Sequence, residues 1–271
     1  MKFIKLIGLI SLICFTFFYT EKIISVSINQ DQIMINLKEI ENDYKIEPIN
    51  AIINEDTIVP GKTGKELDLD NSYKEMKKIG YFEKSLLVYK TIYPEISIYN
   101  NYNKYIISGN TSNKNVSLIY IINNDKTIDN VLNIISNKNT TISFFIDSSY
   151  LNNNIDILNK LKDYEIYNYG NSGIYTKDNL IITNNIINNK TNNSSLYCLF
   201  LTKNEESLNT CANNKMLSIT PSISGNYNNI KNNIKNGSII NITNTKELPN
   251  IIDYIKNKGY NIVSLSNNIK E

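Results

Sequence analysis

The feature that most constrains the fold of this 271-residue chain is the alternation of two kinds of apolar segment beyond residue 110. Short β-branched runs that suit buried strands alternate with stretches whose apolar residues recur at helical spacing. The strand-like runs are 116–122, 142–146, 238–242 and 260–265, and the helix-like stretches are 127–135, 155–161 and 247–258. Alternating strands and helices build parallel sheets or barrels. We therefore expect residues 111–271 to form one α/β domain.

The first 25 residues are typical of an export signal. Lys2 and Lys5 precede an apolar run at 6–19, and charged residues follow it directly. The run ends in bulky residues without a small-x-small cleavage motif. We therefore expect an uncleaved membrane anchor in preference to a signal peptide that is removed. The run is short for a membrane span, so a cleaved signal peptide remains the alternative. In both cases we expect the remainder of the chain on the extracytoplasmic face of a bacterial cell, anchored or secreted.

Residues 26–110 are predicted to form a small α+β module between this segment and the α/β domain. Asp70 or Asn71 is expected to cap a helix, and the apolar run 85–89 is expected to be a strand. The GKTG sequence at 61–64 lacks the glycine spacing of a phosphate-binding loop, so we interpret it as a turn. Nothing in this module names a ligand.

Composition excludes several classes of function. The chain has no His, and reading the sequence shows no Arg, so His-based triads, the usual His-bearing zinc sites and bidentate Arg clamps are excluded. A net charge of +2 gives no basic surface to neutralise a run of phosphates, so we expect no nucleic-acid partner. Cys198 and Cys211 are the pair that can meet in a folded domain. We expect them to be unpaired, buried residues that act as small hydrophobic side chains, in preference to a disulfide.

Several stretches follow the order of elements in a known family. They are VSLIY at 116–120, ISFFIDSSYL at 142–151, DYEIYNYGNSG at 163–173 and, most specifically, GSIINITNTKELPNIIDYIKNKGYNIVSLS at 237–266. In this order the chain resembles the NodB-type polysaccharide deacetylases, carbohydrate esterases that remove acetyl groups from chitin-like or peptidoglycan sugars. The resemblance covers the C-terminal three-fifths of the chain and implies a distorted parallel β/α barrel of the deacetylase type. The small α+β module and the N-terminal signal anchor precede it.

The resemblance also implies that the catalytic positions of the family have been replaced. The replaced positions hold Ile121, Ile122, Tyr169, Gly173, Leu199 and Thr243. The first two stand where the family has an aspartate pair, and the next two where it has metal-binding histidines. The last two stand at an arginine-bearing strand and at a catalytic-acid histidine. We therefore expect a pseudoenzyme with no catalytic residues, no metal and no cofactor.

A barrel of this kind that has lost its chemistry can still bind. Exposed aromatic rings stack on sugar faces, and amide and hydroxyl groups reach sugar oxygens. The candidate glycan-binding residues are Tyr167, Asn168, Tyr169, Ser172 and Tyr175. Core packing of the tyrosines and turn formation by the Asn and Ser are the alternative interpretation.

We therefore expect a catalytically inactive, deacetylase-like protein of the cell envelope. Its expected partners are cell-wall glycan or an envelope protein, with the membrane reached through the N-terminal segment. The alternative is an active deacetylase or other hydrolase with a His-free site at the strand ends, where a β/α barrel places its active groups. The carboxylates available for such a site are Asp125, Asp147, Asp163 and Glu165.

Overall fold

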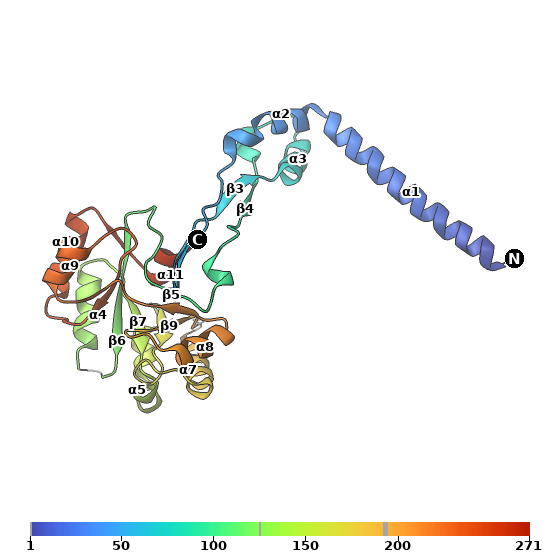
Figure 1. Cartoon of the computed structure of the whole chain (residues 1–271). Coiled ribbons are helices and arrows are strands. Elements are labelled where there is room, and N and C mark those ends of the chain that lie inside the picture. Colours follow the sequence, from blue (N-terminus) through green and yellow to red (C-terminus); the bar gives the residue numbers. More distant parts are fainter. Residues whose placement is uncertain (1, 125, 192–194) are drawn as a thin grey trace. The chain divides into compact units, whose positions relative to one another are not determined.

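The computed structural model describes residues 2–124, 126–191 and 195–271. The chain divides into two compact units that interleave in sequence (Figure 1). The first unit consists of Met1–Pro48 and Thr63–Tyr93, and the second of Ile49–Lys62 and Pro94–Glu271. These units do not coincide with the predicted segments 26–110 and 111–271, because strands from before residue 110 complete a sheet of the second unit.

The first unit contains helices and one antiparallel strand pair. Its elements are α1 (Lys2–Gln30), α2 (Gln32–Ile40), the 3-10 turn Glu41–Tyr44, β3 (Gly64–Leu67), α3 (Leu69–Lys77), the 3-10 turn Lys84–Leu86 and β4 (Tyr89–Ile92). β3 pairs with β4, and Ile33, Leu37 and Met76 form a small core between α2 and α3.

The local structure of this unit differs from the sequence prediction in two places. Helix α3 is capped by Asp68, whose carboxylate accepts the Asn71 N–H at 3.0 Å, and not by either of the expected residues Asp70 and Asn71. The strand expected at 85–89 is a 3-10 turn that leads into β4, because the Ser85 N–H is held by the Glu83 carboxylate at 3.2 Å. A backbone N–H that is bonded to a neighbouring side chain is not available to a sheet.

Helix α1 is continuous over 29 residues and extends past the expected end of the signal segment at residue 25. Its stretch Ile10–Gln30 has a mean hydropathy of 1.4 and is long and apolar enough to cross a membrane. A signal sequence near the N-terminus has the same length and composition, so α1 fits both forms of the expected signal anchor.

The second unit is built on a parallel sheet with β6 (Asn115–Ile122) at its centre. The hydrogen-bonded order is β11-β12-β6-β7-β8, and β13 also pairs with β6. The other strands of this sheet are β7 (Ser143–Ile146), β8 (Ile166–Asn168), β11 (Ile223–Gly225), β12 (Ile239–Ile242) and β13 (Asn261–Val263). Every pairing in this sheet is parallel, as the alternating segments predict.

A second sheet combines strands from residues 52–106 with strands from residues 197–219. Its order is β1 (Ile52–Asn54), β2 (Thr57–Val59), β5 (Tyr105–Ile106), β10 (Leu217–Ile219) and β9 (Tyr197–Leu199). Only the β1–β2 pair is antiparallel. The expected mixed α/β, mostly parallel fold is confirmed. Within the described ranges, its strands form two open sheets and not one hydrogen-bonded ring.

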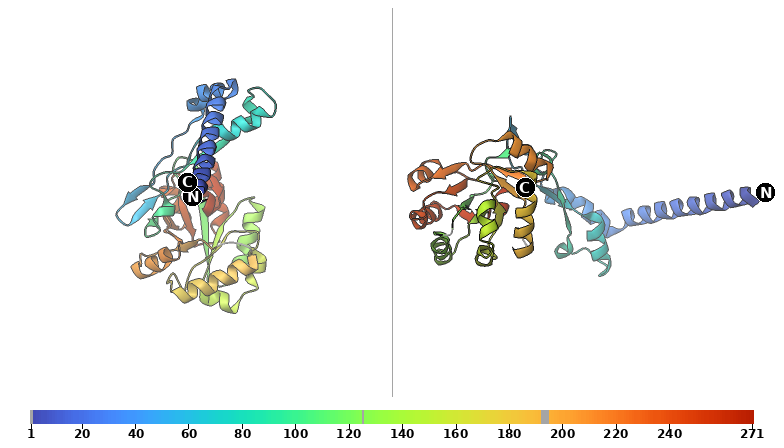
Figure 2. Two further views of the ribbon diagram at one scale, coloured as in Figure 1. Left: turned by 90° about the vertical axis from the view of Figure 1, so that its right-hand side faces the viewer. Right: turned by 90° about the horizontal axis from the view of Figure 1, so that it is seen from below.

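Helices cover the outside of these strands (Figure 2). They are α4 (Ile128–Asn137), α5 (Ser148–Asn153), α6 (Ile157–Leu161), α7 (Lys177–Thr191), α8 (Glu205–Asn213), α9 (Tyr227–Asn233) and α10 (Leu248–Asn257). The short helix α11 (Leu265–Ile269) instead packs Leu265 and Ile269 into the core between the two sheets. The predicted helices at 127–135, 155–161 and 247–258 correspond to α4, α6 and α10.

Side chains of β6 alternate between two cores, as a strand buried on both faces requires. Leu118 and Ile122 pack outward into a core shared with α4 and α10. Ile119 and the partly buried Ile121 pack into a second core, which the inner faces of both sheets enclose. The inward-facing residues nearest the carboxyl ends of the strands are therefore the side chains that a ligand would meet at that end of the inner core.

Candidate functional site

A groove of about 490 Å³ opens at the carboxyl ends of β6, β8 and β12. The lining residues Tyr120 and Ile121 lie near the carboxyl end of β6, and Tyr169 follows β8. Asn241 and Thr243 lie at the carboxyl end of β12. The carboxyl ends of parallel strands meet at one edge of a sheet, which is where α/β folds place their ligands. The groove therefore lies where this architecture would hold a site.

The replaced catalytic positions of the resembled family do not all reach this groove. Ile121, Tyr169 and Thr243 line it, whereas Ile122 and Leu199 are fully buried in the outer and inner cores. Ile121 therefore narrows the groove without closing it. An isoleucine side chain neither accepts a proton nor binds a cation, so this position supplies no catalytic group.

The turn after β8 brings Tyr169 and Gly173 into contact. The Gly173 N–H donates to the Tyr169 carbonyl at 2.9 Å, and Gly173 has a left-handed φ of 84°. A Cβ at Gly173 would lie 3.3 Å from the Tyr169 hydroxyl. The turn is therefore shaped around the tyrosine ring and has little room for a larger side chain at residue 173.

Asp147 holds this turn in place. One carboxylate oxygen accepts the N–H groups of Ser149 and Tyr150 at 2.9 and 3.1 Å, and the other accepts the Ser172 N–H at 2.7 Å. Asp147 is buried, and its charge joins the burial of the ring in raising the pKa of Tyr169. Asp147 thus caps α5 and orders the groove wall, and it is not among the residues that line the groove.

Four of the five predicted glycan-binding residues are buried, among them Tyr169 at 8% exposure. Of these four, only Tyr169 lines the groove, so the structure contradicts the prediction for Tyr167, Asn168 and Tyr175. Tyr167 is 5% exposed and packs edge-on against Tyr197, with ring centroids 4.6 Å apart. Tyr175 is 2% exposed, and its hydroxyl accepts the Leu199 N–H at 2.7 Å. Asn168 is fully buried. Burial raises the pKa of both tyrosines far above its usual value, so the hydroxyls stay neutral. The two tyrosines pack in the core, whereas the Asn168 side chain holds the turn after β8 by accepting the Gly170 N–H at 2.6 Å.

Tyr169 and Ser172 are the two predicted residues that line the groove. They come from the same turn, which Asp147 fixes through the Ser172 N–H. Burial, followed by the nearby Asp147 charge, raises the pKa of the Tyr169 hydroxyl, which is therefore a neutral hydrogen-bonding group at physiological pH. These two residues can offer a ring edge and two hydroxyl groups to a ligand.

The carboxylates considered for a His-free hydrolase do not converge on the groove. Asp163 is exposed, and Glu165 precedes β8, at the opposite end of the strand from the groove. Asp125 lies outside the described residues. Among the groove-lining residues that the structure describes, none carries a charge. No group of three or more His, Cys, Asp or Glu residues in the described ranges is arranged to hold a metal ion.

The sequence reasoning did not single out Asn241, which lies on the inner face of the groove. Asn241 is 3% exposed, and its side-chain oxygen accepts no hydrogen bond from the described part of the chain. Its signal in the sequence is a polar residue that interrupts the apolar run SIINI at 238–242. Such a residue in a buried strand requires a partner.

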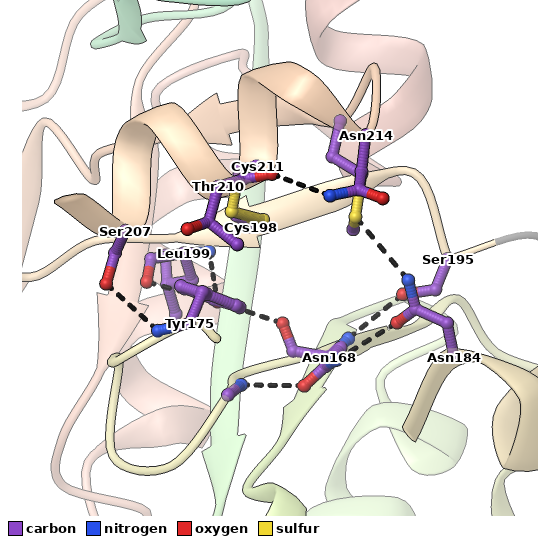
Figure 3. Close-up of a disulfide and its surroundings, with 12 residues drawn as sticks. Asn168, Tyr175, Asn184, Ser195, Cys198, Leu199, Ser207, Thr210, Cys211 and Asn214 are labelled. Atoms are coloured by element: carbon purple, nitrogen blue, oxygen red, sulfur yellow. Dashed lines mark hydrogen bonds between the residues drawn. A yellow bond between two sulfur atoms is a disulfide. The ribbon is translucent and has the colours of Figure 1, made fainter. Parts of the chain in front are cut away.

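A disulfide joins Cys198 on β9 to Cys211 on α8 (Figure 3). The expectation of two unpaired buried cysteines is therefore wrong. Cys198 faces outward from β9 beneath α8, and the two Cα atoms lie 6.5 Å apart, within the range that a disulfide spans. Both cysteines are fully buried. The bond fixes the helix that follows groove residue Leu201.

Comparison with known sequences finds one curated relative and no family model. No family model matches the chain. Over 150 residues the chain is 27% identical to the uncharacterized protein YlxY of Bacillus subtilis, a match that covers 54% of this chain and 47% of that protein. The chain thus spans about half the length of the curated relative it matches.

Solved structures show where the fold belongs. BA3943, a CE4 family pseudoenzyme from Bacillus anthracis, matches with a TM-score of 0.66 at 20% identity, over 89% of this chain and 96% of that one. The Bc1960 peptidoglycan N-acetylglucosamine deacetylase matches with a TM-score of 0.55 at 19% identity, over 61% and 92%. Bacillus subtilis PdaA, a family 4 carbohydrate esterase, matches with a TM-score of 0.53 at 17% identity, over 63% and 86%. The chain therefore has the fold of the CE4 polysaccharide deacetylases, whose solved structures include a pseudoenzyme.

Proposed function

We propose that this chain is a catalytically inactive, deacetylase-like protein of the cell envelope that binds cell-wall glycan in the groove at the ends of β6, β8 and β12. The observation that carries the proposal is the lining of that groove. It is open, yet its described residues carry no charge, and Ile121 stands at the carboxyl end of the central strand. A groove of this kind suits binding of a neutral ligand and lacks the groups for hydrolysis.

The absence of catalysis follows from the side chains in the groove. Deacetylation by a metal-dependent esterase needs ligands for the cation and a base for the attacking water, and these supply several kcal/mol of barrier lowering. Ile121, Tyr169 and Thr243 line the groove at three of the replaced family positions. None of them is a carboxylate or an imidazole. The carboxylate of Asp147 is already bonded to three backbone N–H groups.

The same side chains suit a sugar. Sugar rings have apolar faces edged by hydroxyl groups, and pockets that hold them combine apolar surface with a few placed polar groups. Ile121 and Leu201 offer apolar surface, while Ser172, Asn241 and Thr243 offer neutral hydrogen-bonding groups. The names of the matched structures support the ligand class, because one of them is a peptidoglycan N-acetylglucosamine deacetylase.

Two features support a place outside the cytoplasm. Helix α1 contains a stretch that is long and apolar enough to cross a membrane. The Cys198–Cys211 disulfide is of the kind that persists in oxidising compartments and is rare in the cytosol. We therefore propose that the chain is anchored at the extracytoplasmic face, or exported to it, through its N-terminal segment.

Acetate release tests the loss of catalysis. Purified full-length protein, incubated with acetylated chitooligosaccharide or peptidoglycan, is expected to release acetate at the rate of a blank without protein. Metal analysis of the same preparation is expected to find less than stoichiometric zinc, nickel or cobalt. Acetate release above the blank that disappears with a chelator would instead establish an active esterase.

Retention on insoluble peptidoglycan tests glycan binding. We expect the full-length protein to sediment with peptidoglycan and Tyr169→Ala to lose at least half of this retention, because it removes the ring that lines the groove. Tyr93→Ala is the matched control, since Tyr93 is 74% exposed and does not line the groove. No retention of the unmodified protein would contradict glycan binding and leave an envelope protein as the partner to search for.

A further inference from the structure

Asn241 lies at the inner end of the groove, among apolar side chains. It lies on β12 in register with Ile119 of β6, and Ile239 precedes it on the same inward face. Its side chain is 3% exposed and lines the groove. An aliphatic residue would fit this apolar setting without any requirement for a partner.

The side-chain oxygen of Asn241 lacks such a partner among the described residues. This Oδ1 atom is buried and accepts no hydrogen bond from the described residues. A buried polar atom without a partner destabilises a folded chain relative to an apolar side chain of the same shape, and most such atoms in native proteins are bonded. Because Asn241 also lines the groove, a group that enters the groove can satisfy the amide.

The character of the amide restricts which group that is. The amide of Asn offers one acceptor oxygen and an NH₂ group with two donor hydrogens, and it carries no charge, so it matches a neutral amide or hydroxyl of a ligand. An ammonium group at the same place would be removed from water with no carboxylate among the described groove-lining residues to pair with it, which is strongly unfavourable. The described groove lining supplies no carboxylate, and that of Asp147 is occupied by backbone N–H groups.

From these observations we infer that the groove discriminates by ligand charge. It binds an N-acylated sugar and rejects the same sugar with a free ammonium group, and Asn241 sets this preference. The inference rests on the proposed glycan binding and goes further, because it makes the protein a reader of the acetylation state of a glycan. Its ligand would be glycan on which deacetylation has not occurred.

Isothermal titration calorimetry of the full-length protein tests the inference. The probes are tetramers of N-acetylglucosamine and of glucosamine, at about pH 6, where an aliphatic amine is protonated. We expect the protein to bind the acetylated tetramer at least tenfold more tightly. Asn241→Asp keeps the shape and adds a negative charge, and we expect it to shrink or reverse this ratio by at least tenfold.

Two further variants separate binding from folding. Asn241→Leu removes the amide, and we expect it to weaken binding of the acetylated tetramer about tenfold while the thermal midpoint stays the same or rises. A purely structural asparagine would instead lower the midpoint when replaced. Asn250→Asp is the charge control, because residue 250 is exposed on α10 and does not line the groove, and we expect its binding ratio to match that of the unmodified protein.

The outcomes separate this inference from the proposed function. Equal binding of both tetramers by the unmodified protein overturns the charge discrimination and leaves glycan binding intact. Binding of neither tetramer overturns both. An unchanged ratio in Asn241→Asp, or unchanged affinity in a folded Asn241→Leu, removes Asn241 as the residue that sets the preference and overturns the inference as stated.

Discussion

Glu165, which is partly buried, and Asn241, which is buried, differ in their hydrogen bonding. The Glu165 carboxylate accepts the Ser143 hydroxyl of β7 at 2.7 Å and bonds both the hydroxyl and the N–H of Ser266 on α11. Burial raises the pKa of Glu165, but these hydrogen bonds outweigh it, so the pKa lies below its usual value. The Asn241 side-chain oxygen accepts no hydrogen bond from the part of the chain that the structure describes. The first residue therefore stabilises the fold, and the second is available to a ligand.

Replacing Glu165 by Gln is expected to lower the free energy of unfolding by about 1.5–3 kcal/mol at neutral pH, the range for hydrogen bonds to a charged group. Because the folded pKa is depressed, the stabilisation is fully present above the unfolded pKa and is lost as the pH falls through the folded pKa. Urea denaturation at neutral pH and at about pH 3 measures this. The difference between the two proteins should shrink in acid.

The matched control for this prediction is Glu206→Gln, since Glu206 is exposed at the start of α8. Its free energy of unfolding is expected to change by less than about 0.5 kcal/mol. A Glu165→Gln protein as stable as the unmodified one at neutral pH would show that the carboxylate does not hold α11.

At the scale of elements, β9 and α8 are held together covalently and by hydrogen bonds. Asn204 caps α8 by accepting the Ser207 N–H at 2.8 Å, and the Ser207 hydroxyl in turn accepts the Tyr175 N–H at 2.9 Å (Figure 3). The Cys198–Cys211 disulfide adds a covalent link between β9 and α8. The loop that carries Leu201 to the groove is therefore anchored at both of its ends.

The double replacement of Cys198 and Cys211 by Ala is expected to lower the free energy of unfolding by about 3 kcal/mol. The two residues are 13 apart in sequence, and closing a loop of that size restricts the unfolded chain by about this amount. The midpoint of urea denaturation measures the loss. Cys14→Ala serves as the control, because Cys14 is an unpaired cysteine on α1. An unchanged midpoint in the double variant would contradict the prediction.

Elements whose pattern is local were predicted well. The apolar spacing of 247–258 predicts a helix, and α10 is found at Leu248–Asn257, with Ile251, Ile252 and Ile255 buried. The run 85–89 was predicted as a strand because its residues are apolar, but β4 begins only at Tyr89. Propensity within a short window does not register a side chain such as Glu83 that captures the backbone first.

At the scale of the whole molecule, the second unit is built from two chain segments, Ile49–Lys62 and Pro94–Glu271, which are separated in sequence by Thr63–Tyr93 of the first unit. β2 and β5 pair side by side, and β5 also pairs with β10. Ile58 and Ile106 from these strands are buried in the inner core. The α/β domain therefore cannot be cut free at residue 110 without opening one of its sheets.

A fragment of residues 111–271 is expected to unfold without a cooperative thermal transition, because it lacks β1, β2 and β5 and exposes the edge of β10. The full-length chain is the control and is expected to show a cooperative transition. Circular dichroism during heating, with size-exclusion chromatography, measures both. A fragment that melts cooperatively as a monomer would show that the strands before residue 110 are dispensable.

The sequence by itself determined the chemistry that this protein lacks and the class of its fold. Side-chain identity is independent of folding, so the absence of His and Arg excludes the same sites in any structure. Helical and strand periodicity acts within a dozen residues, so the alternating order of β and α elements could be read directly.

Only the tertiary structure decided which of these side chains meet. Ile121 lines the groove while Ile122 is buried, because successive strand residues point to opposite faces. Tyr169 reaches the groove, but Tyr167 packs against Tyr197 from another sheet. Side-chain direction and strand pairing depend on contacts between residues far apart in the chain, and no local pattern records those contacts.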